Sequence, residues 1–317
     1  MTSEFHLIQQ YFKRPIKQTD LGIGDDAALI RVKEGHHLVV SADMSVVGAH
    51  FFADAAPEHI GWKSLAVNVS DMAAMGAVPN WVTLSIALPE MNETWLEAFS
   101  RGFFACAEAF NIDLIGGDTT KGPLNIAVQI MGEVPVGKAI KRSGAQVGDD
   151  IWVSGLLGSA ALGLAHLLEK TKLPEAELEA CLHALNLPQP RVALGLALRE
   201  IATSCIDISD GLLADLGHIL QASGVGATVH LEHIPCLDTM KPRVHELLVQ
   251  QALLAGGDDY ELCFTAPSHC REAVVAVSEA LGLPLTRIGE VDVVPTLNVL
   301  HHGEPLKLNR LGYDHFA

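Results

Sequence analysis

The stretch Leu65-Ala66-Val67-Asn68-Val69-Ser70-Asp71-Met72-Ala73-Ala74-Met75 is apolar on nearly every face of a helix, and it ends a helix predicted over residues 57–75. An ionised acid in such a helix costs free energy unless it is paired or bound to a metal ion. No basic residue stands three or four positions from Asp71, so its partner must come from elsewhere in the fold. A metal ligand and a capped acid of the core both satisfy this condition.

Working outward from this helix, strand-like and helix-like segments alternate. Strands are predicted at His37–Ala42, Trp81–Leu88 and Asn125–Val136, and an amphipathic helix at Asn92–Phe110. This rhythm predicts an α/β or α+β domain. A cluster of Gly, Lys and Arg within residues 137–150 separates it from a second α/β half, so we place the domains at 1–137 and 138–317.

The second half continues the alternation. Its helices are expected at Ser159–Lys170, Arg191–Thr203, Gly211–Ser223 and His269–Leu281, and its strands at Ala227–His233, Tyr260–Thr265 and Leu285–Val291.

Composition narrows the class of protein. The 317 residues are 49% hydrophobic and carry 38 acids against 21 Lys and Arg, a net charge of −17 that disfavours nucleic acid and anionic membranes. Neither a signal peptide nor a membrane-spanning segment is expected. The six cysteines form no CxxC pair, and we expect a cytoplasmic protein. An acidic protein that binds phosphorylated ligands needs a positive group, and a divalent metal ion would supply it.

Acids beside glycines or at strand ends are the main chemical signal. Each is weak alone, because Gly and Asp are ordinary turn residues, but together they are typical of a nucleotide site with several magnesium ions. They stand at Gly22–Ala28, Ser41-Ala42-Asp43, Asp71, Gly116–Thr120, Ile206–Leu212 and Gly256–Leu262. The glycines of the fourth motif are expected to let the backbone approach a phosphate. The helix after Asp210 is expected to bind an anion at its start, although an ordinary Ser209 or Asp210 cap also fits.

In order and over nearly the whole chain, these motifs resemble the thiamine-monophosphate kinases, within the wider family of aminoimidazole ribonucleotide synthetase-like ATP enzymes. His50-Phe51, Asp259-Tyr260-Glu261-Leu262 and Gly312-Tyr313-Asp314-His315-Phe316 favour the kinases within that family. The resemblance implies an amino-terminal domain whose sheet pairs with its copy in a homodimer, and a carboxy-terminal α/β domain. It also implies phosphorylation of thiamine monophosphate by ATP with several Mg²⁺ ions.

The resemblance also implies roles for individual residues. The implied magnesium ligands are Asp26, Ser41, Asp43, Asp71, Asp118, Asp207 and Asp210, with Ala42 contributing through its backbone. The implied ATP contacts are Gly117, Asp118, Arg142 and Ser209, and the implied contacts of the thiamine phosphate are His50, Asp258 and Tyr313. Two residues depart from the family pattern: Asp258 replaces an expected Glu, and Ala42 replaces a more usual Thr.

Two other functions stay open on sequence alone. One is a relative that uses ATP to activate an amide or a selenide; a selenide enzyme is expected to carry a reactive Cys near its start, and the first cysteine here is Cys106. The other is a regulatory protein that binds a nucleotide without turnover.

Overall fold

The computed structural model describes residues 4–307, 312 and 313, and it divides the chain into two compact units. Unit 1 holds the described residues up to Met72 together with Ala77–Gly137, and unit 2 holds Ala73–Gly76 and the described residues from Lys138 on. Asp314, His315 and Phe316 of the terminal motif lie outside the described residues. None of the described helices is both long and apolar enough to cross a membrane.

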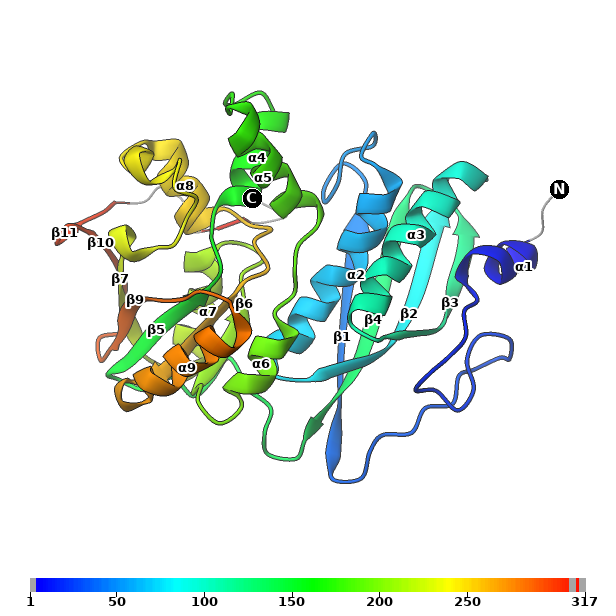
Figure 1. Ribbon diagram of the computed structural model, residues 1–317, viewed down its shortest axis with the longest axis horizontal. Coiled ribbons are helices and arrows are strands. Elements are labelled where there is room, and N and C mark those ends of the chain that lie inside the picture. The colour runs from blue at the N-terminus through cyan, green and yellow to red at the C-terminus, as the bar shows by residue number, and fades with distance from the viewer. Residues whose placement is uncertain (1–3, 308–311, 314–317) are drawn as a thin grey trace. The chain divides into compact units, whose positions relative to one another are not determined.

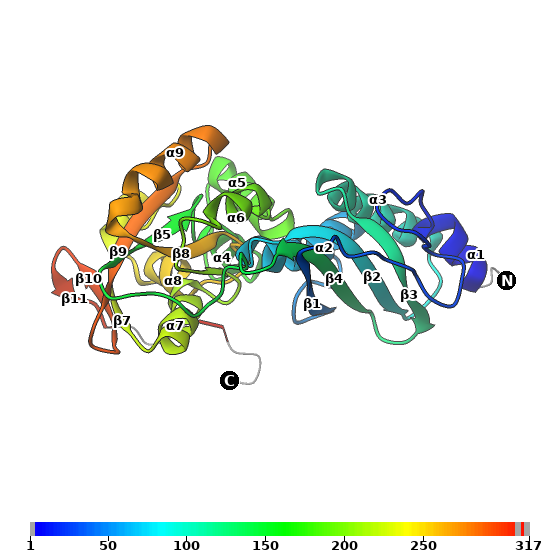
Figure 2. The same ribbon diagram turned by 90° about the horizontal axis from the view of Figure 1, so that it is seen from below.

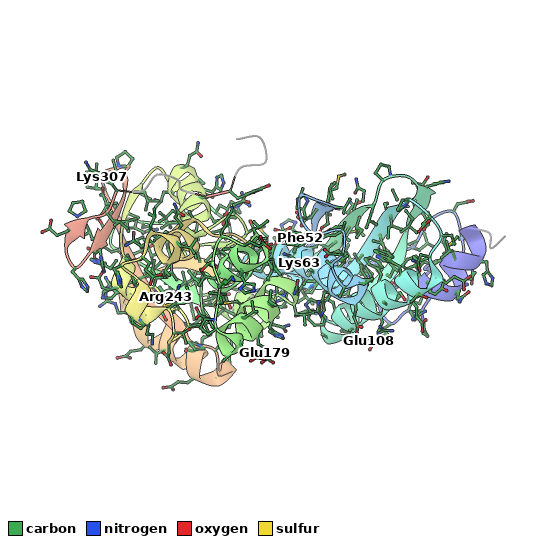
Figure 3. All side chains as sticks on the ribbon, turned by 90° about the horizontal axis from the view of Figure 1, so that it is seen from above. Phe52, Lys63, Glu108, Glu179, Arg243 and Lys307 are labelled. Atoms are coloured by element: carbon green, nitrogen blue, oxygen red, sulfur yellow. The ribbon has the colours of Figure 1, made fainter. Side chains whose placement is uncertain are left out.

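Unit 1 is a four-stranded sheet with strand order β1-β4-β2-β3, and helices α2 and α3 cover one of its faces (Figures 1 and 2). Its elements are α1 (Glu4–Leu7), the π-helix Ile8–Phe12, β1 (His36–Val46), α2 (Pro57–Ala74), β2 (Val78–Leu88), α3 (Glu93–Ala109), β3 (Asp113–Lys121) and β4 (Asn125–Pro135). The apolar faces of the helices form the core against the sheet, with Leu65, Phe99 and Phe103 fully buried. Glu108, labelled in Figure 3, lies on the exposed side of α3.

Alternation along β1 decides which of its side chains face the helices. Ser41 and Asp43 pair with Ile130 and Val128 of β4, both buried, so these positions share the face that α2 and α3 cover. The intervening positions of β1 face the opposite way. Leu38, Val40 and Met44 are 42%, 49% and 55% exposed there, so β1 presents an open apolar face.

Unit 2 is built on a mixed seven-stranded sheet with strand order β11-β10-β7-β9-β5-β8-β6. Its strands are β5 (Asp149–Ser154), β6 (Ser204–Asp207), β7 (Gly226–His230), β8 (Leu262–Pro267), β9 (Leu285–Asp292), β10 (Leu297–His301) and β11 (Glu304–Pro305). Its α-helices are α4 (Ser159–Leu167), α5 (Glu175–Asn186), α6 (Val192–Leu198), α7 (Leu212–Ser223), α8 (Leu247–Ala255) and α9 (Arg271–Leu281). Short 3-10 turns lie at Leu231–His233, Lys241–Arg243 and Ser268–Cys270.

Both faces of this second sheet are covered. Ile151 and Val153 of β5 pack into a core with residues of α4, α5, α7 and α8, whereas Trp152 between them packs on the other face with residues of α6 and α9. A strand buried on both faces is apolar at consecutive positions rather than at alternate ones. This explains the run Ile151-Trp152-Val153 in the sequence.

Several predicted elements are shorter than expected, and two of them end where the chain changes its structure. The helix predicted over 191–203 ends at Leu198, because residues 199–203 turn into β6 and the Thr203 N–H donates to the Thr265 carbonyl at 2.9 Å. The strand predicted over 227–233 ends at His230, where a 3-10 turn begins.

Candidate functional site

In unit 1, three of the candidate residues meet between β1 and α2. The Ser41 hydroxyl donates a hydrogen bond of 2.6 Å to Oδ2 of Asp71, and a side-chain hydrogen bond also joins Asp71 to Asp43. The partner of Asp71 is therefore tertiary, as expected. Ala42 lies between Ser41 and Asp43 on the opposite face of β1, so its side chain takes no part in this cluster.

The two carboxyl groups change the acidity of Asp43. Loss of hydration, repulsion by Asp71 and the hydrogen bond to Asp71 together raise the pKa of Asp43 to about 7. Asp43 retains an exposed surface, which weakens the contribution of burial. Repulsion by Asp71 still raises the pKa of Asp43, because this repulsion depends on the contact of the two carboxylates and not on burial. The pair therefore shares a proton near neutral pH, and a cation would take the place of that proton.

The other candidates of unit 1 lie on exposed segments. Asp26 stands in the turn that the Leu21–Leu29 bridge closes. Asp118 lies on β3, where its Oδ1 accepts a hydrogen bond of 2.9 Å from the Thr119 N–H. His50 is exposed in a turn, and its Nδ1 accepts from the Val46 N–H at 3.1 Å.

Within the described residues of each unit, the candidate metal ligands do not form a metal-binding cluster. Among residues 4–307, 312 and 313, no group of three or more His, Cys, Asp or Glu side chains lies close enough together to hold a metal ion. What the structure brings together in unit 1 is the pair of acids with Ser41.

Gly116 and Gly117 lie inside β3, and the structure gives Gly117 a packing role. The register between β2 and β3 shifts at Val82 and Thr83, which leaves a bulge before Gly116. A Cβ on Gly117 would lie 1.7 Å from the Leu84 carbonyl oxygen, and its φ is +145°. Gly117 is therefore required for strand pairing, whether or not a phosphate approaches it.

In unit 2, three separate segments of candidate residues converge. Asp207 is buried at the end of β6, and Ser209 and Asp210 follow in the loop before α7. The Asp258 N–H donates to the Ser209 carbonyl, and the Tyr313 N–H donates to the Asp210 carbonyl, both at 2.9 Å. Candidate residues near positions 207, 258 and 313, up to 106 positions apart in the chain, are thus brought together.

Arg142 is exposed beside β6. Its neighbour Lys141 accepts a hydrogen bond of 3.0 Å from the Cys205 N–H, which fixes the backbone there. The Ser223 hydroxyl at the end of α7 donates to the Arg142 carbonyl at 3.5 Å. The guanidinium is therefore carried on an anchored backbone.

Three N–H groups just before α7, where the sequence predicts an anion-binding helix start, are already occupied. Oδ2 of Asp215 accepts hydrogen bonds from the N–H groups of Ser209, Asp210 and Gly211, at 2.9, 3.0 and 3.2 Å. These three donors are therefore not available to an external anion, whereas anion binding by the N–H groups of α7 itself, which begins at Leu212, stays a prediction. Asp215 was not among the predicted site residues, although like Asp71 it is an acid among apolar helical residues; unlike Asp71 it has a basic residue, His218, three positions away.

The loop that carries Asp258 has an unusual backbone. Asp258 and Tyr260 have φ of +70° and +49°, in the left-handed region that ordinary residues seldom adopt. Between them, the Asp259 carboxylate accepts from the Gly158 N–H at 2.9 and 3.0 Å and so joins the loop to the start of α4. Such backbone strain is often found at functional sites. Asp259, which the sequence names only as part of the Gly256–Leu262 motif, thus has a structural role.

Comparison with known proteins gives a consistent family. The N-terminal domain model of the AIR synthase related proteins matches residues 24–134, and the C-terminal domain model matches residues 146–302. The chain is 46% identical to the thiamine-monophosphate kinase of Salmonella typhimurium over 319 residues, which cover 99% of this chain and 98% of the relative.

Solved structures agree. The crystal structure of thiamine-monophosphate kinase from Stenotrophomonas maltophilia superposes with a TM-score of 0.84 at 47% identity, covering 91% of this chain and 92% of that one. A structure named "AaThiL complexed with AMPPCP and TMP" superposes with a TM-score of 0.76 at 32% identity, covering 93% and 92%.

Proposed function

Because this chain is an enzyme of the thiamine-monophosphate kinase family within the AIR synthase related proteins, we propose that it transfers the terminal phosphoryl group of ATP to thiamine monophosphate. The products are thiamine diphosphate and ADP. A phosphate oxygen of the acceptor attacks the terminal phosphorus of ATP in line with the leaving ADP. That oxygen is already largely ionised near pH 7, since the second pKa of a phosphate monoester is about 6. No general base is then required, and the protein's task is to align two anions that repel each other.

The observation that carries this proposal is the contact of Asp43 with Asp71 beside Ser41. Two carboxylates and a hydroxyl are oxygen donors of the kind that magnesium prefers. The pair fits a divalent cation, because such an ion would remove the repulsion that now raises the pKa of Asp43.

We extend this assignment to the other acids on the strength of the family pattern. Mg²⁺ would be held by Asp26, Ser41, Asp43, Asp71, Asp118, Asp207 and Asp210, with the backbone of Ala42. Bound magnesium would neutralise phosphate charge during the transfer. ATP would contact Gly117, Asp118, Arg142 and Ser209, and thiamine phosphate would contact His50, Asp258 and Tyr313. Residues 1–137 would bind Mg-ATP and form the dimer, and residues 138–317 would complete the nucleotide and acceptor sites.

The open face of β1 supports the homodimer in this proposal. Leu38, Val40 and Met44 are exposed on it, and an apolar sheet face of this kind is typically covered by a partner. We expect the wild-type protein to be a dimer by light scattering and Val40→Lys to shift it to monomer. A monomeric wild type, or a dimer that survives the substitution, would contradict this part of the proposal.

A cytoplasmic location belongs to the same proposal. All six cysteines are free thiols, and five of them are buried, as expected in a reducing compartment that supplies ATP.

The test is formation of thiamine diphosphate from Mg-ATP with and without thiamine monophosphate, followed by chromatography. Asp71→Asn should abolish it, whereas Glu58→Gln should leave it unchanged. Glu58 is a matched control, because it lies on the same helix and makes an exposed ion pair with Arg101. ATP turnover without thiamine diphosphate would discard this acceptor. Bound ATP without turnover for any acceptor would favour a regulatory protein, and an active Asp71→Asn would make Asp71 structural.

A further inference from the structure

The loop Ile208–Gly211 has all of its backbone hydrogen-bonding groups satisfied within unit 2. The Ile208 N–H donates to the Glu261 carbonyl at 2.8 Å, and the N–H groups of the next three residues donate to Oδ2 of Asp215. Its carbonyls accept, in chain order, from the N–H groups of Tyr260, Asp258, Tyr313 and Asp215, at 2.8 to 3.0 Å. Because none of these N–H groups is free, a ligand that needs a hydrogen-bond donor from this loop must find it on a side chain.

Asp215 is the one side chain among these partners; the others are backbone groups. It lies in the first turn of α7, and it is 3% exposed, so the loop shields it from solvent. A single carboxylate oxygen that accepts three consecutive N–H groups constrains all three peptide planes together. Hydrogen bonds to a charged acceptor are stronger than those between neutral groups.

The direction of the loop's side chains depends on these peptide planes. Gly211 ends the loop with φ of +122°, and a Cβ there would lie 2.7 Å from the backbone of Ala255, so the chain has no room to shift on that side. On the other side, a Cβ on Gly257 would lie 2.4 Å from the Ser209 carbonyl oxygen. Ser209 and Asp210 are the partly exposed residues of this packed loop.

We propose that Asp215 is a positioning residue, which fixes the Ser209–Gly211 backbone so that the side chains of Ser209 and Asp210 are held ready for the nucleotide and its magnesium. The inference rests on the proposed function for the identity of that ligand. Asp215 itself lies behind the loop and does not touch substrate. Its effect on catalysis passes through its three hydrogen bonds.

The first test needs no variant and no ligand. In the wild-type protein without nucleotide, hydrogen exchange followed by mass spectrometry should find the amides of residues 209–211 protected. Exchange as fast as in an unstructured loop would overturn the proposal. Asp215→Ala should speed exchange of these amides by about ten- to hundredfold, the factor for one lost hydrogen bond to a charged acceptor.

The second test measures affinity for a non-hydrolysable ATP analogue with Mg²⁺ by calorimetry, without acceptor. Asp215→Ala should weaken binding at least tenfold, and Asp215→Asn should restore part of it, because its amide oxygen can accept from the same N–H groups. The matched control is Asp150→Ala. It removes another buried carboxylate of unit 2, one that accepts from Arg271 and Arg287, and it should change neither measurement.

The outcomes separate this inference from the proposed function. Wild-type affinity and protection in Asp215→Ala would overturn the positioning role. If Asp215→Ala does not fold, the wild-type exchange and Asp215→Asn decide, and an Asn variant with unprotected amides but full affinity would also overturn it. A wild-type protein that binds the analogue and protects the loop, but makes no thiamine diphosphate, would contradict the proposed acceptor only.

Discussion

Replacing Arg191 by Met should destabilise unit 2 strongly, because Arg191 neutralises a buried acid. Glu261 is 5% exposed, and it accepts hydrogen bonds from Nε of Arg191 at 2.7 Å, from Nη2 of the same residue and from the Ser154 hydroxyl at 2.5 Å. Met keeps the unbranched stem of the side chain but removes the guanidinium group and its charge. Removing one partner of a buried ion pair costs about 3–5 kcal/mol, since the remaining charge is left without compensation.

The assay is urea unfolding followed by fluorescence of Trp152, which is buried in β5 and stacks on Phe264 of β8. With a slope of about 3 kcal/mol per molar urea, the midpoint should fall by about 1–2 M. The double variant with Glu261→Met should regain most of this loss, because the unpaired charge is gone.

A control shows whether any charge loss has this effect. Lys138→Met breaks the exposed pair of Lys138 with Glu200, and it should leave the midpoint unchanged. The reasoning is refuted if Arg191→Met lowers stability by less than about 1 kcal/mol, or if the double variant is no more stable than the single one.

Three further predictions concern single positions. Burial opposes ionisation of Asp150, but hydrogen bonds from two arginines outweigh it and hold the pKa of Asp150 below its usual value. The ionised carboxylate therefore contributes to folding stability above pH ~3.9, and this contribution is lost as the pH falls through the folded pKa. Asp150→Asn should therefore lower the unfolding midpoint at pH 7 and much less below pH ~4. The pKa of Asp43 is raised, so its ionisation lowers the stability of the Mg-free protein as the pH rises from about 4 through 7. Asp43→Asn should therefore leave the Mg-free protein no less stable at pH 8, although it should abolish activity. A clear loss in thermal midpoint would contradict the repulsion between Asp43 and Asp71. Gly117→Ala should prevent stable folding of unit 1, whereas Gly35→Ala, at a positive φ with no atom within 4 Å of the added Cβ, should cost only about 1 kcal/mol in thermal unfolding.

The sequence predicted well those features that depend on local pattern. The apolar helix around Asp71, three of the four strands of the first sheet and the need for a tertiary partner of Asp71 follow from side-chain periodicity and the cost of an unpaired acid. Strand β3, which carries Gly116 and Gly117, was not predicted. The structure adds which residue that partner is. Ser41 lies 30 positions away, and a single sequence contains no signal for such a distant pairing.

Features that depend on close approach of backbones were missed. The ATP contact of Gly117 stays a prediction, but its packing against Leu84 depends on a bulge that no local pattern indicates. Asp215 turns back from the first turn of α7 and accepts from the three N–H groups just before the helix, a contact that the sequence does not reveal. Asp215 resembles Asp71 as an acid among apolar helical residues, but a basic residue, His218, stands three positions on.

The most direct measurement of the central claim follows the label from ATP that carries radioactive phosphorus in its terminal phosphate. With purified protein, Mg²⁺ and thiamine monophosphate, all transferred label should appear in thiamine diphosphate, and none should remain on the protein at any time during turnover. Label in free phosphate alone would contradict thiamine monophosphate as the acceptor. Label trapped on a residue of the protein would contradict direct in-line transfer.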